Sequence, residues 1–155
     1  MQLTEIFAPN TVLPAVDAST KTQALRALAE AAGEALSLDP KMIFNALHER
    51  ERLGSTAIGN GVALPHAKIS GLDRLVGWVA CLENPVEFDA VDDQPVDLVI
   101  LLLAPDNAGS EHLRVLAQLS RLARDHKHCA AVRDCSGAHA VWQMLTAGQD
   151  RQKAA

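Results

Sequence analysis

The chain has 155 residues, a length typical of one domain that buries about two thirds of its unfolded surface. Hydrophobic residues make up 48% and charged residues 21%, which is a globular composition and excludes a disordered chain. Only 3% of residues are aromatic and Tyr is absent, so the core must be built from Leu, Val, Ile and Ala. We expect a single domain over residues 1–155.

Charge and hydropathy exclude two classes of partner. The net charge is −5, so the chain lacks the basic surface that nucleic acid requires and is repelled by anionic membranes. The longest apolar run, residues 98–104, is far shorter than the roughly 20 residues of a spanning helix. No signal peptide is visible, and three cysteines without disulfide-framework spacing favour a reducing cytosol. We therefore expect a cytoplasmic protein without nucleic-acid or membrane partners.

Four helices are predicted, because apolar residues recur at helical spacing behind residues that start helices. Pro40 suits the first turn of the second helix, which Gly54 ends. Ser110 is expected to cap the third helix, which is long. The expected starts are Ser19 or Thr20, Pro40, the residue after Ser110, and Ser136, the last helix ending at Thr146 with Gly148 beyond it.

Strands are predicted around residues 11–13, 62–64, 75–82 and 96–103. The last of these is apolar at consecutive positions, as expected for a strand covered on both faces. Two helices, then three strands, then two helices imply a sheet with helices on both sides. The acidic, Pro-containing stretch between the last two strands leaves their relative direction open.

His66 is the first candidate for chemistry. It follows a loop that contains Gly54, Gly59 and Gly61, and Pro65 restricts the backbone just before it. Glycines let backbone N–H groups converge, which suits an anion near the imidazole. The loop is not a Walker motif, because no Gly-Lys-Ser/Thr closes it. The plain alternative is a surface histidine without a role.

Arg50 and His112 are the next candidates. Arg50 extends the apolar stripe of its helix and could hold phosphate oxygens beside the glycine loop. Its alternatives are an ion pair with Glu49 or Glu51, or a stem that covers apolar surface. His112 lies on the buried stripe of the third helix, in a first turn that favours neutral imidazole and nearby anions. Its alternative is a satisfied core histidine.

A cluster of potential metal ligands near the C-terminal end raises the alternative of a zinc site. Three histidines and two cysteines fall within a fourteen-residue window, namely His126, His128, Cys129, Cys135 and His139. Their spacing lacks the paired Cys-x2-Cys of structural zinc sites, and the segment fits two helix ends. We expect neither a metal nor a cofactor.

The glycine loop and the Pro-His pair together resemble a known signature. The string Gly54-Ser-Thr-Ala-Ile-Gly-Asn-Gly-Val-Ala-Leu-Pro-His66 is similar to the active-site motif of type-2 enzyme IIA domains. These form the fructose/mannitol/nitrogen family of the bacterial phosphoenolpyruvate-dependent phosphotransferase system (PTS). Gln94-Pro-Val-Asp-Leu98 and Glu111-His-Leu113 fit the same family, so the resemblance covers nearly the whole chain. The nitrogen-regulatory branch is the most similar, because its loop is alike and no IIB or IIC domain is attached.

The resemblance implies a fold and a site. The fold is a three-layer α/β/α sandwich around a mixed, mostly five-stranded sheet. His66 matches the family's phosphorylated histidine, Arg50 its phosphate-neutralising arginine and His112 its second active-site histidine. Backbone and hydroxyl groups of the glycine loop would complete the phosphate site. The loop residues expected there are Ser55, Thr56, Gly59, Asn60 and Gly61.

The implied activity is reversible phosphoryl transfer to His66 from the phosphohistidine of an HPr-like carrier, in the nitrogen branch a dedicated one. An ordinary histidine pKa of about 6.5 leaves most of the imidazole neutral and able to attack. The phosphorylation state would control regulatory partners such as kinases or transport systems. Leu53, Ile58 and Val62 are candidates to line the docking surface.

Three alternatives remain open at this point. A sugar-permease component would pass the phosphoryl group from His66 to a IIB domain during fructose or mannitol uptake. A binding module would hold a small anion in the glycine loop without any transfer. A zinc hydrolase would use His66, His112 and a carboxylate.

Overall fold

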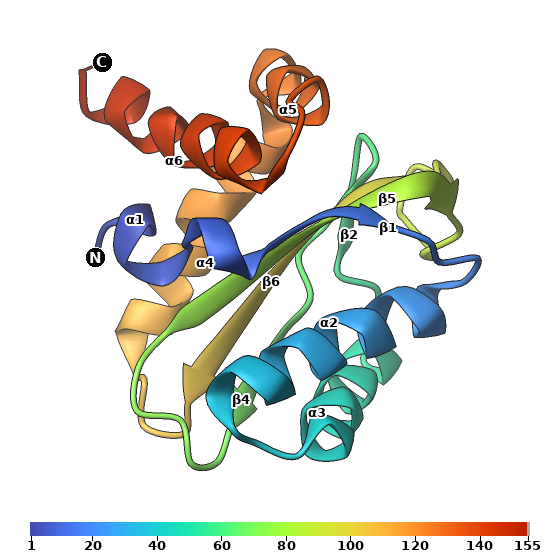
Figure 1. Cartoon of the computed structure of the whole chain (residues 1–155), viewed down its shortest axis with the longest axis vertical. Coiled ribbons are helices and arrows are strands. Elements are labelled where there is room, and N and C mark those ends of the chain that lie inside the picture. Colours follow the sequence, from blue (N-terminus) through green and yellow to red (C-terminus); the bar gives the residue numbers. More distant parts are fainter. Residues whose placement is uncertain (155) are drawn as a thin grey trace.

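A computed structural model describes the backbone of residues 1–154 and the side chains of residues 1–147. Its centre is a six-stranded mixed sheet (Figure 1). Five strands follow the order β1-β5-β6-β3-β2, and β4 pairs with β6 beyond β3. The strands are β1 (Val12–Val16), β2 (Ala57–Gly59), β3 (Val62–Ala63), β4 (His66–Ile69), β5 (Val76–Val86) and β6 (Val96–Pro105). The mixed sheet of the expected sandwich is therefore confirmed.

The strand β6 is the centre of the sheet, as its continuous apolar sequence predicted. It runs antiparallel to β5 and parallel to both β3 and β4. Its side chains alternate between two cores, because successive residues of a strand point to opposite faces. Val99, Leu101 and Leu103 face one core, whereas the residues between them face the other. The direction of β5 relative to β6, left open by the sequence, is antiparallel.

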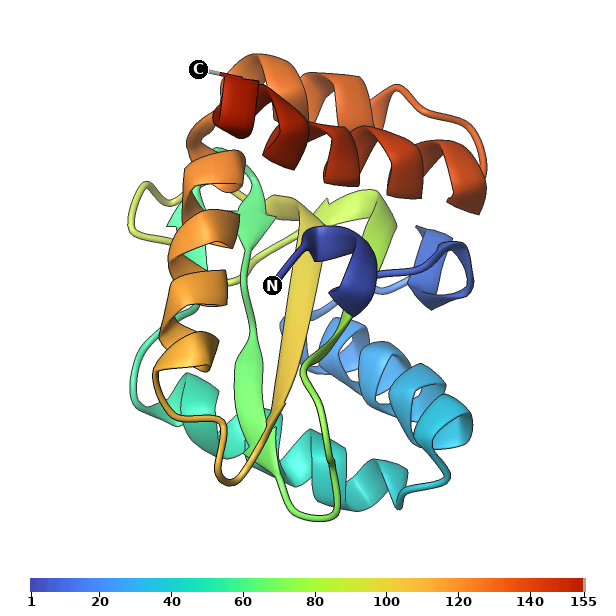
Figure 2. The same ribbon diagram turned by 90° about the vertical axis from the view of Figure 1, so that its left-hand side faces the viewer.

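Helices cover both faces of this sheet, which confirms the three layers (Figure 2). The helices α2 (Lys21–Leu36) and α3 (Pro40–Arg52) pack on one face. The opposite face carries α1 (Leu3–Ile6), α4 (Ser110–Arg124), α5 (His126–Arg133) and α6 (Ala138–Ala154). A short 3-10 turn, Pro9–Thr11, leads into β1. Among the described residues, no helix is both long enough and apolar enough to cross a membrane.

The expected helix starts at Thr20 and Pro40 are confirmed. The Thr20 hydroxyl accepts from the Gln23 amide, and Asp39 caps the helix that Pro40 begins. The expected cap at Ser110 is wrong, because Gly109 occupies that position and Ser110 is the first helical residue. The expected end before Gly148 is also wrong. The helix α6 continues to Ala154, since one helical glycine costs only about 1 kcal/mol.

Two short strands, β2 and β4, and two helices, α1 and α5, were not predicted. The strand β2 lies inside the glycine loop and pairs antiparallel with β3. The strand β4 begins at His66 itself, directly after Pro65. Pro65 has no N–H, but its carbonyl accepts from the Leu102 amide at 3.0 Å, so pairing with β6 continues on its far side. The helix α5 occupies the window in which two helix ends were expected.

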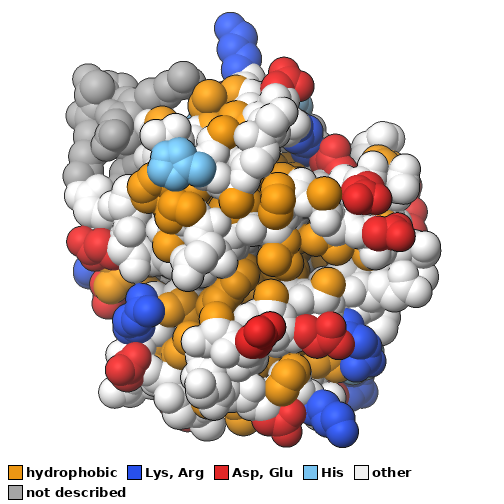
Figure 3. Space-filling model, in the orientation of Figure 1, with side chains coloured by type: hydrophobic (Ala, Val, Ile, Leu, Met, Phe, Trp, Pro, Cys, Tyr) orange, Lys and Arg blue, Asp and Glu red, His pale blue; other side chains and the backbone are white. Residues whose placement is uncertain are grey.

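The N-terminal segment closes one end of the sheet. Phe7 is fully buried, and its carbonyl accepts a 2.8 Å hydrogen bond from Trp142 Nε1 of α6. Apolar atoms form a band across this face between α6 and α2 (Figure 3). A hollow of about 190 Å³ beneath it is lined by Phe7, Val76 and Trp78, among others. The strand β5 approaches the Phe7 ring closely at Gly77, where a Cβ atom would overlap that ring.

We expect Gly77→Ala to lower the free energy of unfolding by about 1–3 kcal/mol, because a buried ring must shift to admit the methyl group. Urea unfolding followed by circular dichroism measures this loss. Adding Phe7→Leu to Gly77→Ala should cost less than the sum of the two single substitutions. A strictly additive pair would contradict the predicted overlap.

Candidate functional site

The three predicted site residues come together from three separate elements. Arg50 lies in the last turn of α3, His66 begins β4, and His112 lies in the first turn of α4. The helices α3 and α4 belong to opposite layers, so the site forms where β4 passes between them. All three residues line one cavity of about 370 Å³. Its other lining residues are Ala46, Glu49, Leu53, Ala67 and Lys68.

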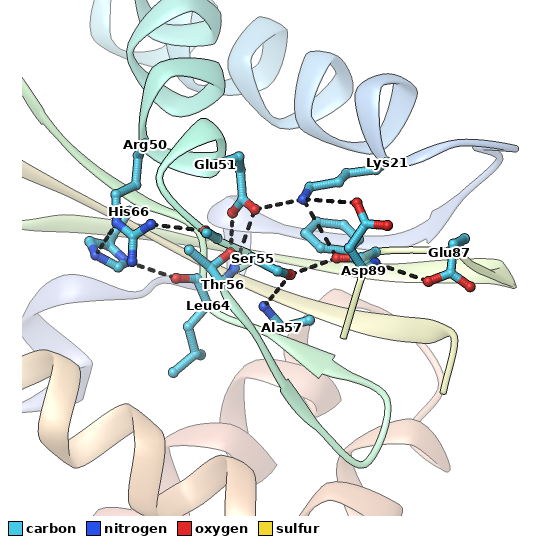
Figure 4. A network of polar contacts seen from close by, with 12 residues as sticks. Lys21, Arg50, Glu51, Ser55, Thr56, Ala57, Leu64, His66, Glu87 and Asp89 are labelled. Atoms are coloured by element: carbon cyan, nitrogen blue, oxygen red, sulfur yellow. Dashed lines mark hydrogen bonds and ion pairs between the residues drawn. The ribbon is translucent and has the colours of Figure 1, made fainter. Parts of the chain in front are cut away.

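Two hydrogen bonds orient the His66 ring (Figure 4). Its Nδ1 atom lies 2.9 Å from the Leu64 carbonyl oxygen, and Arg50 Nε lies 3.3 Å from its Nε2 atom. A carbonyl oxygen only accepts, so Nδ1 carries the proton and donates. Nε2 then holds a lone pair, to which Arg50 Nε donates. The geometry therefore selects one neutral tautomer and turns its unprotonated nitrogen toward the guanidinium.

The environment favours the neutral form of His66. Burial lowers the pKa of the imidazole, and the nearby Arg50 charge lowers it further. The Leu64 hydrogen bond and the Glu51 charge act in the opposite direction, but the net pKa lies below the ordinary value of about 6.5. A neutral imidazole has a lone pair available for attack on an electrophile. The same shift extends this reactive state to more acidic pH.

Arg50 is held without a carboxylate partner. Its Nη1 donates to the Gly54 carbonyl at 3.0 Å. Both ion pairs that sequence reasoning offered as alternatives are wrong. Glu49 pairs with Arg52 at 2.9 Å, and Glu51 pairs with Lys21 at 2.7 Å. Within the described part of the chain, no carboxylate lies within ion-pair distance of Arg50, so its charge is available to an incoming anion.

His112 is buried beside His66. It is 8% exposed, and the two rings meet edge to face with centroids 5.8 Å apart. Burial is the main cause that lowers the pKa of His112, followed by the charges of His66 and Lys68. Its Nε2 atom is buried and has no hydrogen-bond partner among the described residues. The alternative of a satisfied core histidine therefore does not hold for Nε2 within the described structure.

The predicted loop residues divide into two groups, and neither places its polar groups at His66. The Ser55 hydroxyl donates to Phe88 O at 2.6 Å, and Thr56 hydrogen-bonds with Glu51. Farther along, the Asn60 amide donates to Asp92 at 3.0 Å. Gly59 also lies against Asp92, whose carboxylate would repel a phosphate.

The tip of the glycine loop borders a different cavity. Asn60 and Gly61 line a separate hollow of about 440 Å³, together with Arg133 and Asp97. The tip is clamped there, because Arg133 donates to Asn60 O at 2.8 Å. These contacts turn the tip toward Arg133 and Asp92, and a role of the loop amides at the phosphate stays a prediction. The glycines serve the turn, where Asn60 and Gly61 both have positive φ.

The candidate docking residues are also partly corrected. Leu53 is 84% exposed at the rim of the His66 cavity, as expected of a contact residue. Val62 is fully buried in the sheet and is excluded as a contact residue, and Ile58 is half-buried against the α4 side. Sequence reasoning missed Leu113, which is 67% exposed directly after His112. The signal was available, because Leu113 falls on the polar side of the helical stripe that contains His112.

The residues of the zinc hypothesis do not form a centre. His128 and Cys129 are buried in α5, whereas His126 and His139 are exposed. Among the residues that the structure describes, no three His, Cys, Asp or Glu side chains gather closely enough to hold a metal ion. The three cysteines of the described chain form no disulfide bond.

Comparison with known proteins identifies the family. Residues 5–148 match the sequence model of the "Phosphoenolpyruvate-dependent sugar phosphotransferase system, EIIA 2" family. The chain belongs to this EIIA type-2 family. It is also 43% identical to the nitrogen regulatory protein of Bradyrhizobium diazoefficiens over 145 residues, which are 94% of this chain and 95% of that protein.

Solved structures agree with the family assignment. The nitrogen regulatory protein IIA-Ntr of Neisseria meningitidis superposes with a TM-score of 0.88 at 31% identity, covering 92% of this chain and 98% of that one. The mannitol IIA protein of Escherichia coli superposes with a TM-score of 0.74 at 22% identity, covering 90% and 98%. The second likeness shows the shared fold. The EIIA type-2 chain described here is thus similar to nitrogen-regulatory members in both sequence and structure.

We expect the His66 imidazole to titrate below pH 6.5 and its pKa to rise in Arg50→Gln, because loss of the guanidinium removes a charge that opposes protonation. Nuclear magnetic resonance of the ring protons against pH measures both values. Arg52→Gln is the matched control, since Arg52 is the exposed neighbour paired with Glu49. An unchanged pKa in Arg50→Gln would contradict the placement of Arg50 beside Nε2.

Proposed function

We propose that the chain is a regulatory phosphoryl carrier that accepts a phosphoryl group on Nε2 of His66 from the phosphohistidine of an HPr-like carrier protein. One observation carries the proposal. The lone pair of neutral His66 Nε2 faces a guanidinium that has no carboxylate partner among the described residues. The nucleophilic nitrogen of His66 and the positive charge of Arg50, which would stabilise the phosphoryl oxygens, thus lie side by side. Membership of the EIIA type-2 family supports the same assignment.

The transfer needs little chemistry from the protein. The nitrogen–phosphorus bond of the donor breaks, its imidazole leaves with the electron pair, and a new bond forms to His66 Nε2. The Nδ1 proton stays in its hydrogen bond to Leu64, so no separate base is required. Catalysis then consists of alignment and of stabilising charge on the equatorial oxygens. No metal is needed, because the phosphoryl group arrives activated on nitrogen.

Arg50 and His112 have different tasks in this reaction. Arg50 turns its donors from Nε2 to the phosphoryl oxygens as the group arrives, which its fixed charge and forked geometry allow. His112 lines the same cavity, and its Nε2 atom is buried without a hydrogen-bond partner in the described structure. A phosphoryl oxygen is the partner that would satisfy it. The group is thereby held from both layers of the sandwich.

The rim of the cavity suits a protein donor. Leu53 and Leu113 are exposed apolar side chains at the ends of α3 and α4 that carry Arg50 and His112. Apolar contacts of this kind exclude water around a buried transfer site. Phosphorylation then adds negative charge to the surface that the donor leaves. We propose that this change in charge controls which regulatory partners, such as kinases or transport systems, can bind.

The regulatory role is preferred to that of a sugar-permease component. The likeness to nitrogen regulatory proteins extends over nearly the whole length of both chains. A permease component would hand its phosphoryl group to a IIB domain. Fast transfer from the phosphorylated chain to a purified IIB domain would therefore favour the permease role over the regulatory one.

We expect phosphoenolpyruvate and the upstream carriers to place an acid-labile phosphate on the wild-type chain and none on His66→Ala. Arg50→Ala should slow transfer by about 10²–10³-fold, the usual effect of losing one charge-stabilising donor. Radiolabel incorporation followed over time measures both, with Arg52→Gln as the control. Near-normal transfer by Arg50→Ala would refute the role of its guanidinium.

Phosphorylation should raise the pKa of His112. Burial lowers the pKa of His112, but a phosphoryl dianion on His66 would place a negative charge close to its ring. A nearby negative charge favours the protonated ring and therefore raises its pKa. Nuclear magnetic resonance titration of the phosphorylated chain measures the change, and His66→Ala treated with the same carriers is the control. A pKa of His112 that stays constant on phosphorylation would exclude its contact with the phosphoryl group.

A further inference from the structure

A second polar cluster lies beside the site and is not used in the transfer chemistry (Figure 4). Its centre is the Glu51 carboxylate, which is 5% exposed. Glu51 accepts from the Thr56 amide at 3.2 Å and from the Thr56 hydroxyl. Its second oxygen also lies 2.7 Å from Lys21 Nζ, at the first residue of α2. The carboxylate therefore joins α2, α3 and the loop that follows α3.

Lys21 and Ser55 anchor this cluster to a third segment. Lys21 Nζ lies 3.5 Å from Phe88 O and 4.9 Å from the centre of the Phe88 ring. The Ser55 hydroxyl donates to the same carbonyl at 2.6 Å and accepts from the Ala57 amide at 3.1 Å. The side chains of Lys21, Glu51 and Ser55 thus link the loop to α2, α3 and the segment that contains Phe88. The loop has few ways to move while they stay bonded.

The cluster connects to both reactive groups by short hydrogen-bonded routes. On one side, the held loop presents Gly54 O to Arg50 Nη1 at 3.0 Å. On the other, Thr56 O accepts from the Leu64 amide at 3.0 Å, and Leu64 O accepts from His66 Nδ1 at 2.9 Å. Glu51 therefore bonds directly to the loop that follows α3. This loop contacts the Arg50 guanidinium through Gly54 and the His66 imidazole through Thr56 and Leu64.

Stability alone does not account for a largely buried ion pair at this place. Taking two charges out of water costs several kcal/mol per ion, and well-packed apolar residues are often at least as stabilising. A pair of opposite charges does, however, define direction and distance more narrowly than apolar contacts. The location of the pair, beside the nucleophile and its arginine, indicates that this geometric precision is its main effect.

We infer that Glu51 is a positioning residue for phosphoryl transfer, which acts through Thr56 and Gly54 and depends on Lys21 for its own orientation. The inference rests on the proposed function of His66. Glu51 touches neither the nucleophile nor the phosphoryl group. It holds the separation of Arg50 and His66, and misplacement of such groups by about 1 Å can cost on the order of 10²-fold in rate.

The test combines rates with a double-mutant cycle. Glu51→Gln should slow carrier-dependent phosphorylation by about 10–100-fold. In an Arg50→Ala background the same substitution should cost less than about threefold, because the guanidinium that it positions is gone. Thr56→Val should reproduce much of the loss and Thr56→Ser should restore the rate, since Ser keeps the hydroxyl. Arg52→Gln, next to Glu51 but in an exposed pair, is the control.

A second readout is independent of transfer. Hydrogen exchange of the Arg50 Nε–H, followed by nitrogen-15 magnetic resonance, should be slow in the wild type and fast in Glu51→Gln. Urea unfolding of each variant identifies any that fail to fold, and Thr56→Ser and Thr56→Val then carry the comparison.

The outcomes separate the inference from the function on which it rests. Wild-type rates in Glu51→Gln, an equal loss with and without Arg50, or unchanged exchange at Arg50 would each overturn the positioning role. If instead the wild type accepts no phosphoryl group, the proposed function fails, while the exchange measurement still tests the cluster.

Discussion

The hydrogen bond from His66 Nδ1 to the Leu64 carbonyl is the interaction on which the rest of the site depends. It selects the neutral tautomer, orients the ring and leaves Nε2 as the unprotonated atom. Pro65 keeps the backbone between these two residues stiff, and its own carbonyl is paired with the central strand β6. The imidazole is thus bonded to the Leu64 carbonyl, and the next residue, Pro65, is bonded to β6 through its own carbonyl. These two contacts hold the ring close to the most buried strand of the protein.

The carboxylates near the His66 ring are paired with basic residues other than Arg50. Both lie on α3, and the guanidinium remains uncompensated by the described carboxylates. Burial and that single positive charge together keep His66 neutral. Lys21, which could have competed with Arg50 for an anion, is neutralised by Glu51. Two cations, Arg50 and Lys68, line the cavity, and Arg50 is the one hydrogen-bonded to the His66 ring.

The layered fold explains why the site can be both rigid and accessible. The helices α3 and α4 lie on opposite faces of the sheet, yet each ends or begins beside β4. Arg50 is fixed by the α3 layer and His112 by the α4 layer, so neither side chain depends on a mobile lid. The exposed side chains of Leu53 and Leu113 follow from the same arrangement, because each lies within one turn of the inward-facing residue of its helix.

Much of this protein follows from its sequence by itself. The hydrophobic periodicity of α2 and α3, the helix starts at Thr20 and Pro40 and the continuous apolar run of β6 are local properties, and they determine the layers. Arg50 and His112 could be selected because each is a polar residue on an apolar stripe. The string that ends in Pro65-His66 resembled its family closely enough to indicate the reaction.

Tertiary structure decided what those residues contact. The glycine loop could have folded toward His66 or away from it, and it turns away because Asp92, Asp97 and Arg133, distant in sequence, hold its tip. The strand β4 has no local signal, since it exists only by pairing with β6. Arg50 was left to His66 because Lys21 took Glu51 and Arg52 took Glu49. Competition among charges is settled by three-dimensional proximity, which spacing along a chain does not contain.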